Sequence, residues 1–259
     1  MIPAFGGWRL WPLNSEIAVL RADPQAVRRQ LDPRGRGVVA EYPDLDTAIA
    51  ANAPYPFGRR DTEFLVAAPD GATVTLSSAA PRAGLLHLFR ADAARMGWES
   101  VAAQWTPRQP GQLAAAGFDH FRPSAADLAG PGPGPRATDQ LTVQVADTGR
   151  RWVFDRIPPG AGHPDRDYEV PETYRARRAA DRLPLTLIRR YLLAAGIPVD
   201  DPGYLRGRVI TLTQPRRMTG QVEWSDMAGL RAAAGYPADG MPTDLTADPA
   251  TGPRESIGG

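Results

Sequence analysis

The sequence contains no cysteine and no lysine, and only three of its 259 residues are histidine. Without cysteine, the chain forms no disulfide, no thiolate zinc site and no iron–sulfur cluster. All 30 basic residues are arginine, so a Schiff-base lysine is also excluded. Arginine keeps its charge and binds carboxylates through a planar fork, and recognition of anions by this chain therefore depends on arginine.

The chain also lacks a strong excess of charge and a long apolar run. Its formal net charge is +1, so no global field attracts nucleic acid or an anionic membrane. No stretch approaches the roughly 18 apolar residues of a membrane span, and the first residues lack the charged start and apolar run of a secretory signal. The sequence therefore predicts a cytoplasmic protein that binds neither nucleic acid nor membrane.

Established catalytic motifs are absent as well. No Gly-x-Ser-x-Gly elbow is present, and residues 130–135 alternate glycine with proline, which removes the backbone donors that a phosphate loop needs. His163, Asp165 and Asp167 are suitable metal ligands, but their spacing matches no established site. We therefore expect no metal and no cofactor, and these three residues are the acid–base candidates of an enzyme hypothesis.

Hydrophobic periodicity and turn residues predict the secondary structure of the first half. Asp23 is suited to cap a helix in which Pro24 takes the first position, and Gly71 supplies the positive φ of a hairpin turn. Apolar residues at helical spacing predict a further helix that ends at Met96. Strands are expected at residues 16–22, 38–40, 62–67, 73–77 and 98–105.

In the second half, a long helical stretch is expected from Pro171 onward. Pro184 divides it into two helices or one bent helix, because a proline ring does not fit inside a regular helix. Gly196 and Pro198 mark its end, and a short helix is expected at residues 225–234. Strands are expected at residues 141–145, 151–155 and 209–213.

Together these patterns predict an α+β protein with one or two mixed β-sheets, each packed by helices, and a disordered C-terminal tail. Changes in composition divide the chain into four parts. They are an N-terminal sheet-plus-helix block at residues 1–125, a Gly/Pro linker at 126–138, a C-terminal hairpin-plus-helices block at 139–215, and a mostly disordered tail at 216–259.

The densest candidate site follows Pro171. On an α-helix, Tyr174, Arg178 and Arg182 share one stripe, where they fit an anion or the carboxylates of a partner. The alternative is a solvated face with local ion pairs such as Arg177 with Asp181, which is the more common situation on charged helices.

Residues 151–204 also carry a family pattern. An Arg151-Trp152-Val153-Phe154 strand precedes a Tyr-x-Ala-Arg-Arg-x-x-Asp-Arg helix that begins at Tyr174, and a Tyr-Leu-x-x-x-Gly-Ile helix end follows at Tyr191. The pattern resembles a group of uncharacterised bacterial proteins of actinobacterial type, loosely similar to the immunity-type companions of toxins. The resemblance covers about the central two thirds of the chain, and it implies partner binding without any catalytic residue.

We therefore favour a non-enzymatic protein that binds a protein partner, as an immunity or accessory factor. The expected contact comprises Trp152, Tyr174, Arg178 and Arg182, with arginine meeting acidic groups and aromatic residues supplying buried area. One alternative is an enzyme or ligand-binding protein that holds an anionic substrate in an arginine-lined pocket. Another is a subunit of a larger bacterial assembly.

Overall fold

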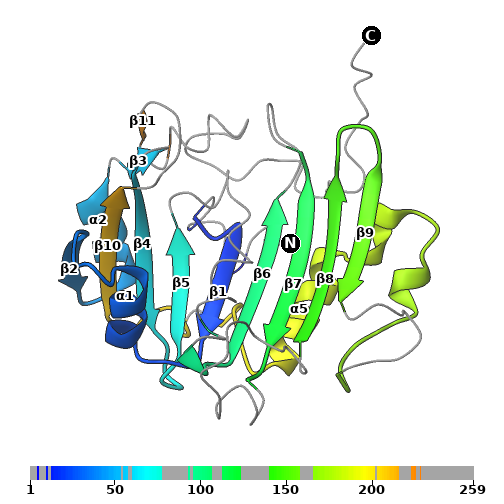
Figure 1. Ribbon diagram of the computed structural model, residues 1–259, viewed down its shortest axis with the longest axis horizontal. Helices are drawn as coiled ribbons and strands as arrows, with labels where there is room; N and C mark the ends of the chain where they lie inside the picture. The colour runs from blue at the N-terminus through cyan, green and yellow to red at the C-terminus, as the bar shows by residue number, and fades with distance from the viewer. Residues whose placement is uncertain are drawn as a thin grey trace.

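A nine-stranded antiparallel β-sheet forms the centre of the molecule (Figure 1). The computed structural model describes residues 13–53, 55–57, 60–77, 96–106, 113–123, 140–157, 166–201, 203–215 and 223–225, together with Phe5, Leu10, Ala93 and Ala228. The strand order is β2-β10-β4-β5-β1-β6-β7-β8-β9. The strands are β1 Glu16–Leu20, β2 Val38–Tyr42, β4 Arg60–Ala67, β5 Thr73–Ser77, β6 Ser100–Thr106, β7 Ala115–Phe121, β8 Gln140–Asp147, β9 Trp152–Ile157 and β10 Val209–Pro215.

The α+β class is confirmed, but the expectation of mixed sheets is wrong. Every strand pair in the described part of the chain is antiparallel, and both sequence blocks contribute to one sheet. Strand β7 of the first block pairs with β8 of the second, and β10 lies between β2 and β4. Two short strands, β3 Tyr55–Phe57 and β11 Glu223–Ser225, form a separate antiparallel pair. The linker at 126–138 and most of the tail at 216–259 lie outside the described residues.

Three α-helices are described, and capping residues explain where two of them begin. Helix α1 spans Pro24–Leu31, and the carboxylate of Asp23 accepts hydrogen bonds from the backbone N–H groups of Gln25 and Ala26. Helix α2, Leu45–Asn52, was not expected from the sequence, although Asp44 caps it in the same way. Helix α5, Leu185–Ala194, agrees with the expected second part of the long helical stretch.

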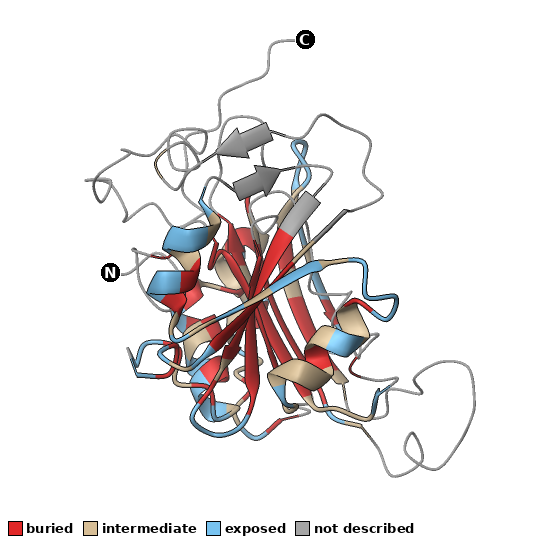
Figure 2. Cartoon of the chain, turned by 90° about the vertical axis from the view of Figure 1, so that its left-hand side faces the viewer, coloured by how far each residue is buried: buried red, intermediate tan, exposed pale blue. Residues whose placement is uncertain are grey.

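The two faces of the sheet differ in chemistry. On one face, which we call the apolar face, Ile17, Phe64 and Phe118 pack with α2 and α5 in a single hydrophobic core. The opposite face carries buried polar side chains, among them Glu16, Glu63 and Asp119, beside a smaller apolar cluster around α1. Figure 2 shows the buried residues concentrated in the central strands, with the exposed residues of the helices turned outward.

Residues 171–182 do not form the expected α-helix. They contain two short 3-10 helices, η2 Thr173–Arg175 and η3 Ala179–Arg182. Ala176 and Arg178 have extended ψ angles of 139° and 129°, which interrupt any continuous helix. Buried contacts of neighbouring side chains, described below, hold this irregular path in place, so tertiary packing overrides the helical preference of the segment.

The expected helix that ends at Met96 lies mostly outside the described residues, although Ala93 and Met96 are helical. The expected helix at 225–234 is likewise not described beyond Ser225 and Ala228. Among the helices of the described part of the chain, none has the length and apolar character needed to cross a membrane.

Candidate functional site

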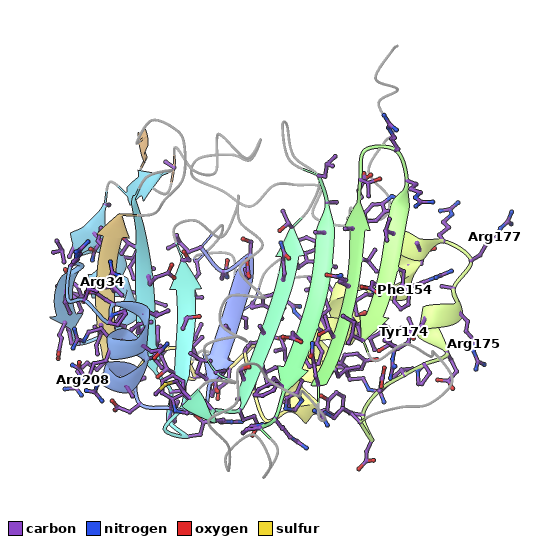
Figure 3. The ribbon with its side chains drawn as sticks, in the orientation of Figure 1. Arg34, Phe154, Tyr174, Arg175, Arg177 and Arg208 are labelled. Carbon is purple, nitrogen blue, oxygen red and sulfur yellow. The ribbon has the colours of Figure 1, made fainter. Side chains whose placement is uncertain are left out.

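The arginine-rich part of the chain crosses the apolar face of the sheet near one end. We call residues 166–183 the anchored segment. Its 3-10 helix η3 packs on both β8 and β9, and the ring of Tyr174 lies 5.3 Å from the ring of Phe154 on β9 (Figure 3). The segment therefore covers the apolar face beside the edge of the sheet, and three sets of polar contacts, buried or part-buried, attach it there.

The first contact is a buried ion pair between β9 and the anchored segment. The guanidinium of Arg156 donates from Nε to Glu169 Oε1 at 2.7 Å and from Nη2 to Glu169 Oε2 at 2.9 Å. The side chains are only 4% and 0% exposed. Such a two-pronged pair needs both partners, because either charge alone in this environment would be strongly unfavourable.

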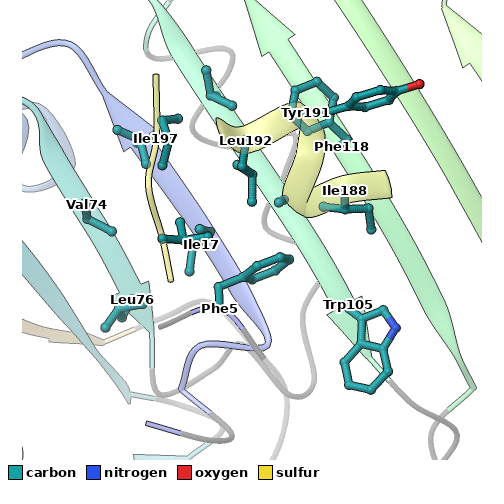
Figure 4. Packing of buried hydrophobic residues seen from close by; sticks show 14 of the residues in the cluster. Phe5, Ile17, Val74, Leu76, Trp105, Phe118, Ile188, Tyr191, Leu192 and Ile197 are labelled. Carbon is teal, nitrogen blue, oxygen red and sulfur yellow. The ribbon is translucent and has the colours of Figure 1, made fainter. Parts of the chain in front are cut away.

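The second contact joins the segment to α5. The hydroxyl groups of Tyr174 and Tyr191 are hydrogen-bonded at 2.8 Å, and the Tyr191 hydroxyl also accepts from the backbone N–H of Val170 at 2.9 Å. Tyr191 lies in the hydrophobic core beside Phe118 (Figure 4). Burial raises the pKa of both phenols, so both remain protonated and available as hydrogen-bond donors.

The third contact is a relay of three titratable groups. His120 on β7 lies between Glu99 and Tyr168, with Nε2 2.8 Å from Glu99 Oε1 and Nδ1 2.6 Å from the Tyr168 hydroxyl. The hydrogen bond from His120 is the main cause that lowers the pKa of Glu99 to about 2, and Arg122 adds to it. Burial lowers the pKa of His120, which is therefore neutral and donates from Nε2 while it accepts from Tyr168.

Sequence reasoning did not select this relay as a site. No strand was expected around His120, so no local signal marked it; in the structure it shares its face of β7 with Phe118. Its partners come from positions 21 residues before it and 48 residues after it, and no local pattern connects them.

Above these anchors, the arginines of the segment divide into two groups. Arg182 is half-buried: its Nε donates to the carbonyl oxygen of Ala176 at 3.0 Å, and its guanidinium lies 5.2 Å from the centre of the Phe154 ring. Arg175, Arg177 and Arg178 are exposed, and within the described part of the chain none of their guanidinium groups has a hydrogen-bond or ion-pair partner. Figure 3 shows Arg175 and Arg177 pointing away from the sheet.

The four residues expected in the site therefore have different positions and roles, and only Tyr174 and Arg182 share a contact, the ring of Phe154. Trp152 is half-buried on β9, Arg178 is exposed, and Arg182 is held against Phe154. Tyr174 is only 2% exposed, and its side chain lies between the segment and the sheet, against Phe154 and Tyr191. The expected stripe does not exist because there is no α-helix, and the expected ion pair of Arg177 with Asp181 is not formed within the described residues.

The metal hypothesis gains no residue from the structure. Asp167 is exposed in the anchored segment, whereas His163 and Asp165 lie outside the described residues. No group of three or more potential metal ligands occurs in the part of the chain that the structure describes.

Comparison of the chain with protein-family models, with curated proteins and with solved structures returned no match.

Proposed function

We propose that this chain is a non-enzymatic protein that binds an acidic surface of a protein partner through the exposed arginines of the anchored segment. In the cell, this binding would serve an immunity or accessory role, as the sequence resemblance implies. The observation that supports it is the combination of a firmly attached segment with three exposed guanidinium groups, those of Arg175, Arg177 and Arg178, that lack partners in the described part of the chain.

The attachment matters because binding orders flexible groups at an entropic cost. Here the backbone that carries the arginines is already held by Glu169, Tyr168 and Tyr174. A partner would therefore order only the arginine side chains, at about 0.5–1.5 kcal/mol each, and not the backbone as well. Guanidinium groups carried on an ordered backbone recognise carboxylates by two parallel hydrogen bonds, which gives orientation as well as affinity.

Within this proposal, the residues expected from the sequence take separate roles. Arg178 contacts the partner together with Arg175 and Arg177, and Trp152 contributes contact area at the border of the site. Tyr174 is a positioning residue, since its hydroxyl is directed to Tyr191 and its ring to Phe154.

The test compares two triple variants in the full-length protein. Tagged wild-type protein is first used to isolate a stoichiometric protein partner from its own host, and the dissociation constant of the purified pair is then measured. R175A/R177A/R178A should weaken binding by at least about tenfold, and its effect should shrink in high salt. The control R29A/R190A/R206A removes three other exposed arginines and should change binding less than about twofold.

Equal losses in the two variants would show that only overall charge matters and would contradict the proposed site. Failure to isolate any stoichiometric partner after a moderate-salt wash would contradict partner binding altogether.

A further inference from the structure

Strand β9 is the edge of the sheet next to the anchored segment, and hydrogen-bond geometry shows which of its backbone groups face outward. In an antiparallel pair, opposed residues alternate between hydrogen-bonded and non-hydrogen-bonded positions. The N–H of Asp147 on β8 donates to Ala114, toward β7, so Asp147 is not hydrogen-bonded to Trp152, which lies opposite it on β9. The N–H and C=O groups of Trp152 therefore point away from β8, and those of Phe154 do so two residues later.

These outward groups are unpaired in the described part of the chain. No backbone hydrogen bond joins Trp152 or Phe154 to the anchored segment or to another described element beyond β8. The register between β8 and β9 is continuous from Trp152 to Ile157, so neither a bulge nor a proline protects this edge. An open edge of this kind is a template for one more strand.

The side chains on the two sides of this edge differ. Phe154 lies on the face that the anchored segment covers, where it contacts Tyr174 and Arg182. Figure 3 shows Arg175 and Arg177 of that segment on the outer side of β9. On the opposite face, Val153 and Ile157 are 38% and 41% exposed. A strand placed against β9 would have alternate side chains on these two faces.

We propose that β9 receives an extended segment of the partner protein as a tenth strand, with acidic residues facing Arg175, Arg177 and Arg178 and apolar residues facing Val153 and Ile157. This inference rests on the proposed function, because it specifies the form of the partner that the arginines bind. Backbone hydrogen bonds to Trp152 and Phe154 supply affinity, and the alternation of acidic and apolar side chains supplies specificity.

The other edge of the sheet, β2, is less suited to an acidic strand. The N–H of Ala67 donates to Arg208, so alternate residues of β10 bond to β4 and β2, and the outward backbone groups of β2 belong to Val39 and Glu41. The Glu41 carboxylate accepts from Gln25 at 2.7 Å and is paired with Arg208 at 3.9 Å, so β2 has a carboxylate among its outward residues, whereas Trp152 and Phe154 of β9 carry none. The two edges therefore provide a comparison within one molecule.

The probe is an eight-residue peptide of alternating glutamate and valine, with capped ends, titrated into the full-length protein by calorimetry. The control peptide has four glutamates followed by four valines, so it has the same charge and composition without the alternation. We expect the alternating peptide to bind wild-type protein at least about tenfold more tightly than the block peptide.

Variants then test the backbone contact. W152P removes one outward N–H at the first position of an edge strand, where proline is tolerated, and W152A removes the side chain alone. We expect W152P to bind the alternating peptide at least about fivefold more weakly than W152A, and V39P on the other edge to bind like wild type. If W152P does not fold, as judged by circular dichroism, the peptide comparison on wild-type protein still decides.

The outcomes separate this inference from the proposed function. Equal binding of the two peptides that is lost in R175A/R177A/R178A would overturn strand addition and leave the arginine surface supported. Preference for the alternating peptide that persists in this variant would support strand addition and overturn the arginine surface. Absence of binding by both peptides to wild-type protein would overturn the inference.

Discussion

The buried ion pair between Arg156 and Glu169 offers the sharpest test of how the arginine-bearing segment is attached. Replacing Arg156 with methionine keeps much of the side-chain volume but leaves the Glu169 carboxylate without its guanidinium in an environment where it has no solvent contact. Removal of one partner from a buried pair costs about 3–5 kcal/mol. That is a large part of the roughly 5–15 kcal/mol that keeps a typical domain folded.

The double variant R156M/E169L separates charge from packing. Because it removes both charges together, it avoids the uncompensated charge, and a buried pair replaced by apolar residues of similar size is often no less stable. We therefore expect the double variant to be more stable than either single variant, which gives a coupling free energy of several kcal/mol in the double-mutant cycle.

The assay is chemical unfolding monitored by circular dichroism, with all four proteins of the cycle at one pH. Hydrogen exchange gives a second readout, because loss of the pair should expose the backbone amide of Tyr174 to exchange before global unfolding. Single variants that cost less than about 1 kcal/mol would refute the claim that this pair holds the segment on the sheet.

Two further predictions concern the relay and the close approach of Gly207 to Ala67, the last residue of β4. Neutral His120 has a pKa below its ordinary value of 6.5, so the unfolded chain binds a proton that the folded chain does not; stability should fall as pH decreases from 7 to 5, by up to about 1.4 kcal/mol per pH unit. In H120Q this part of the pH dependence of stability should vanish in denaturant titrations, and an unchanged slope would contradict a buried neutral histidine. Below about pH 4.5, protonation of Glu99, whose pKa is about 2, should destabilise the wild-type protein further. A Cβ at Gly207 would lie 1.7 Å from the carbonyl oxygen of Ala67, so G207A should lose more than about 2 kcal/mol. Gly71 has a positive φ of 81°, but a Cβ added there would meet no atom within 4 Å, so G71A should lose only about 1 kcal/mol of stability. Equal shifts of the unfolding temperature in G207A and G71A would refute the steric argument.

Local signals in the sequence were sufficient for several elements. Asp23 and Pro24 indicate where α1 begins, since a carboxylate cap and a restricted φ act on neighbouring residues only. The hairpin of β4 and β5 follows from the turn around Gly71, and α5 follows from apolar spacing that places Ile188 and Leu192 on one face. In each case the responsible interactions join residues that are close in sequence.

Other elements were not visible locally. Strand β7 begins Ala115-Ala116-Gly117, residues with little preference for strands, and it forms because β6 and β8 supply hydrogen-bonding partners on both sides. The segment around Tyr174 has residues that favour a helix, yet it follows an irregular path because Glu169 and Tyr174 bury their polar groups against Arg156 and Tyr191.

For the candidate site, too, some features were predictable from the sequence and others were not. Composition and local pattern were enough to establish that anion recognition depends on arginine, that cysteine and lysine chemistry are excluded, and that the arginines gather after Pro171. The fold was needed to show that Tyr174 is an anchor, that Arg175, Arg177 and Arg178 are exposed, and that β9 is an open edge among the described strands. The physical reason is that burial and strand pairing are set by residues distant in sequence, whereas composition and local periodicity record only near neighbours.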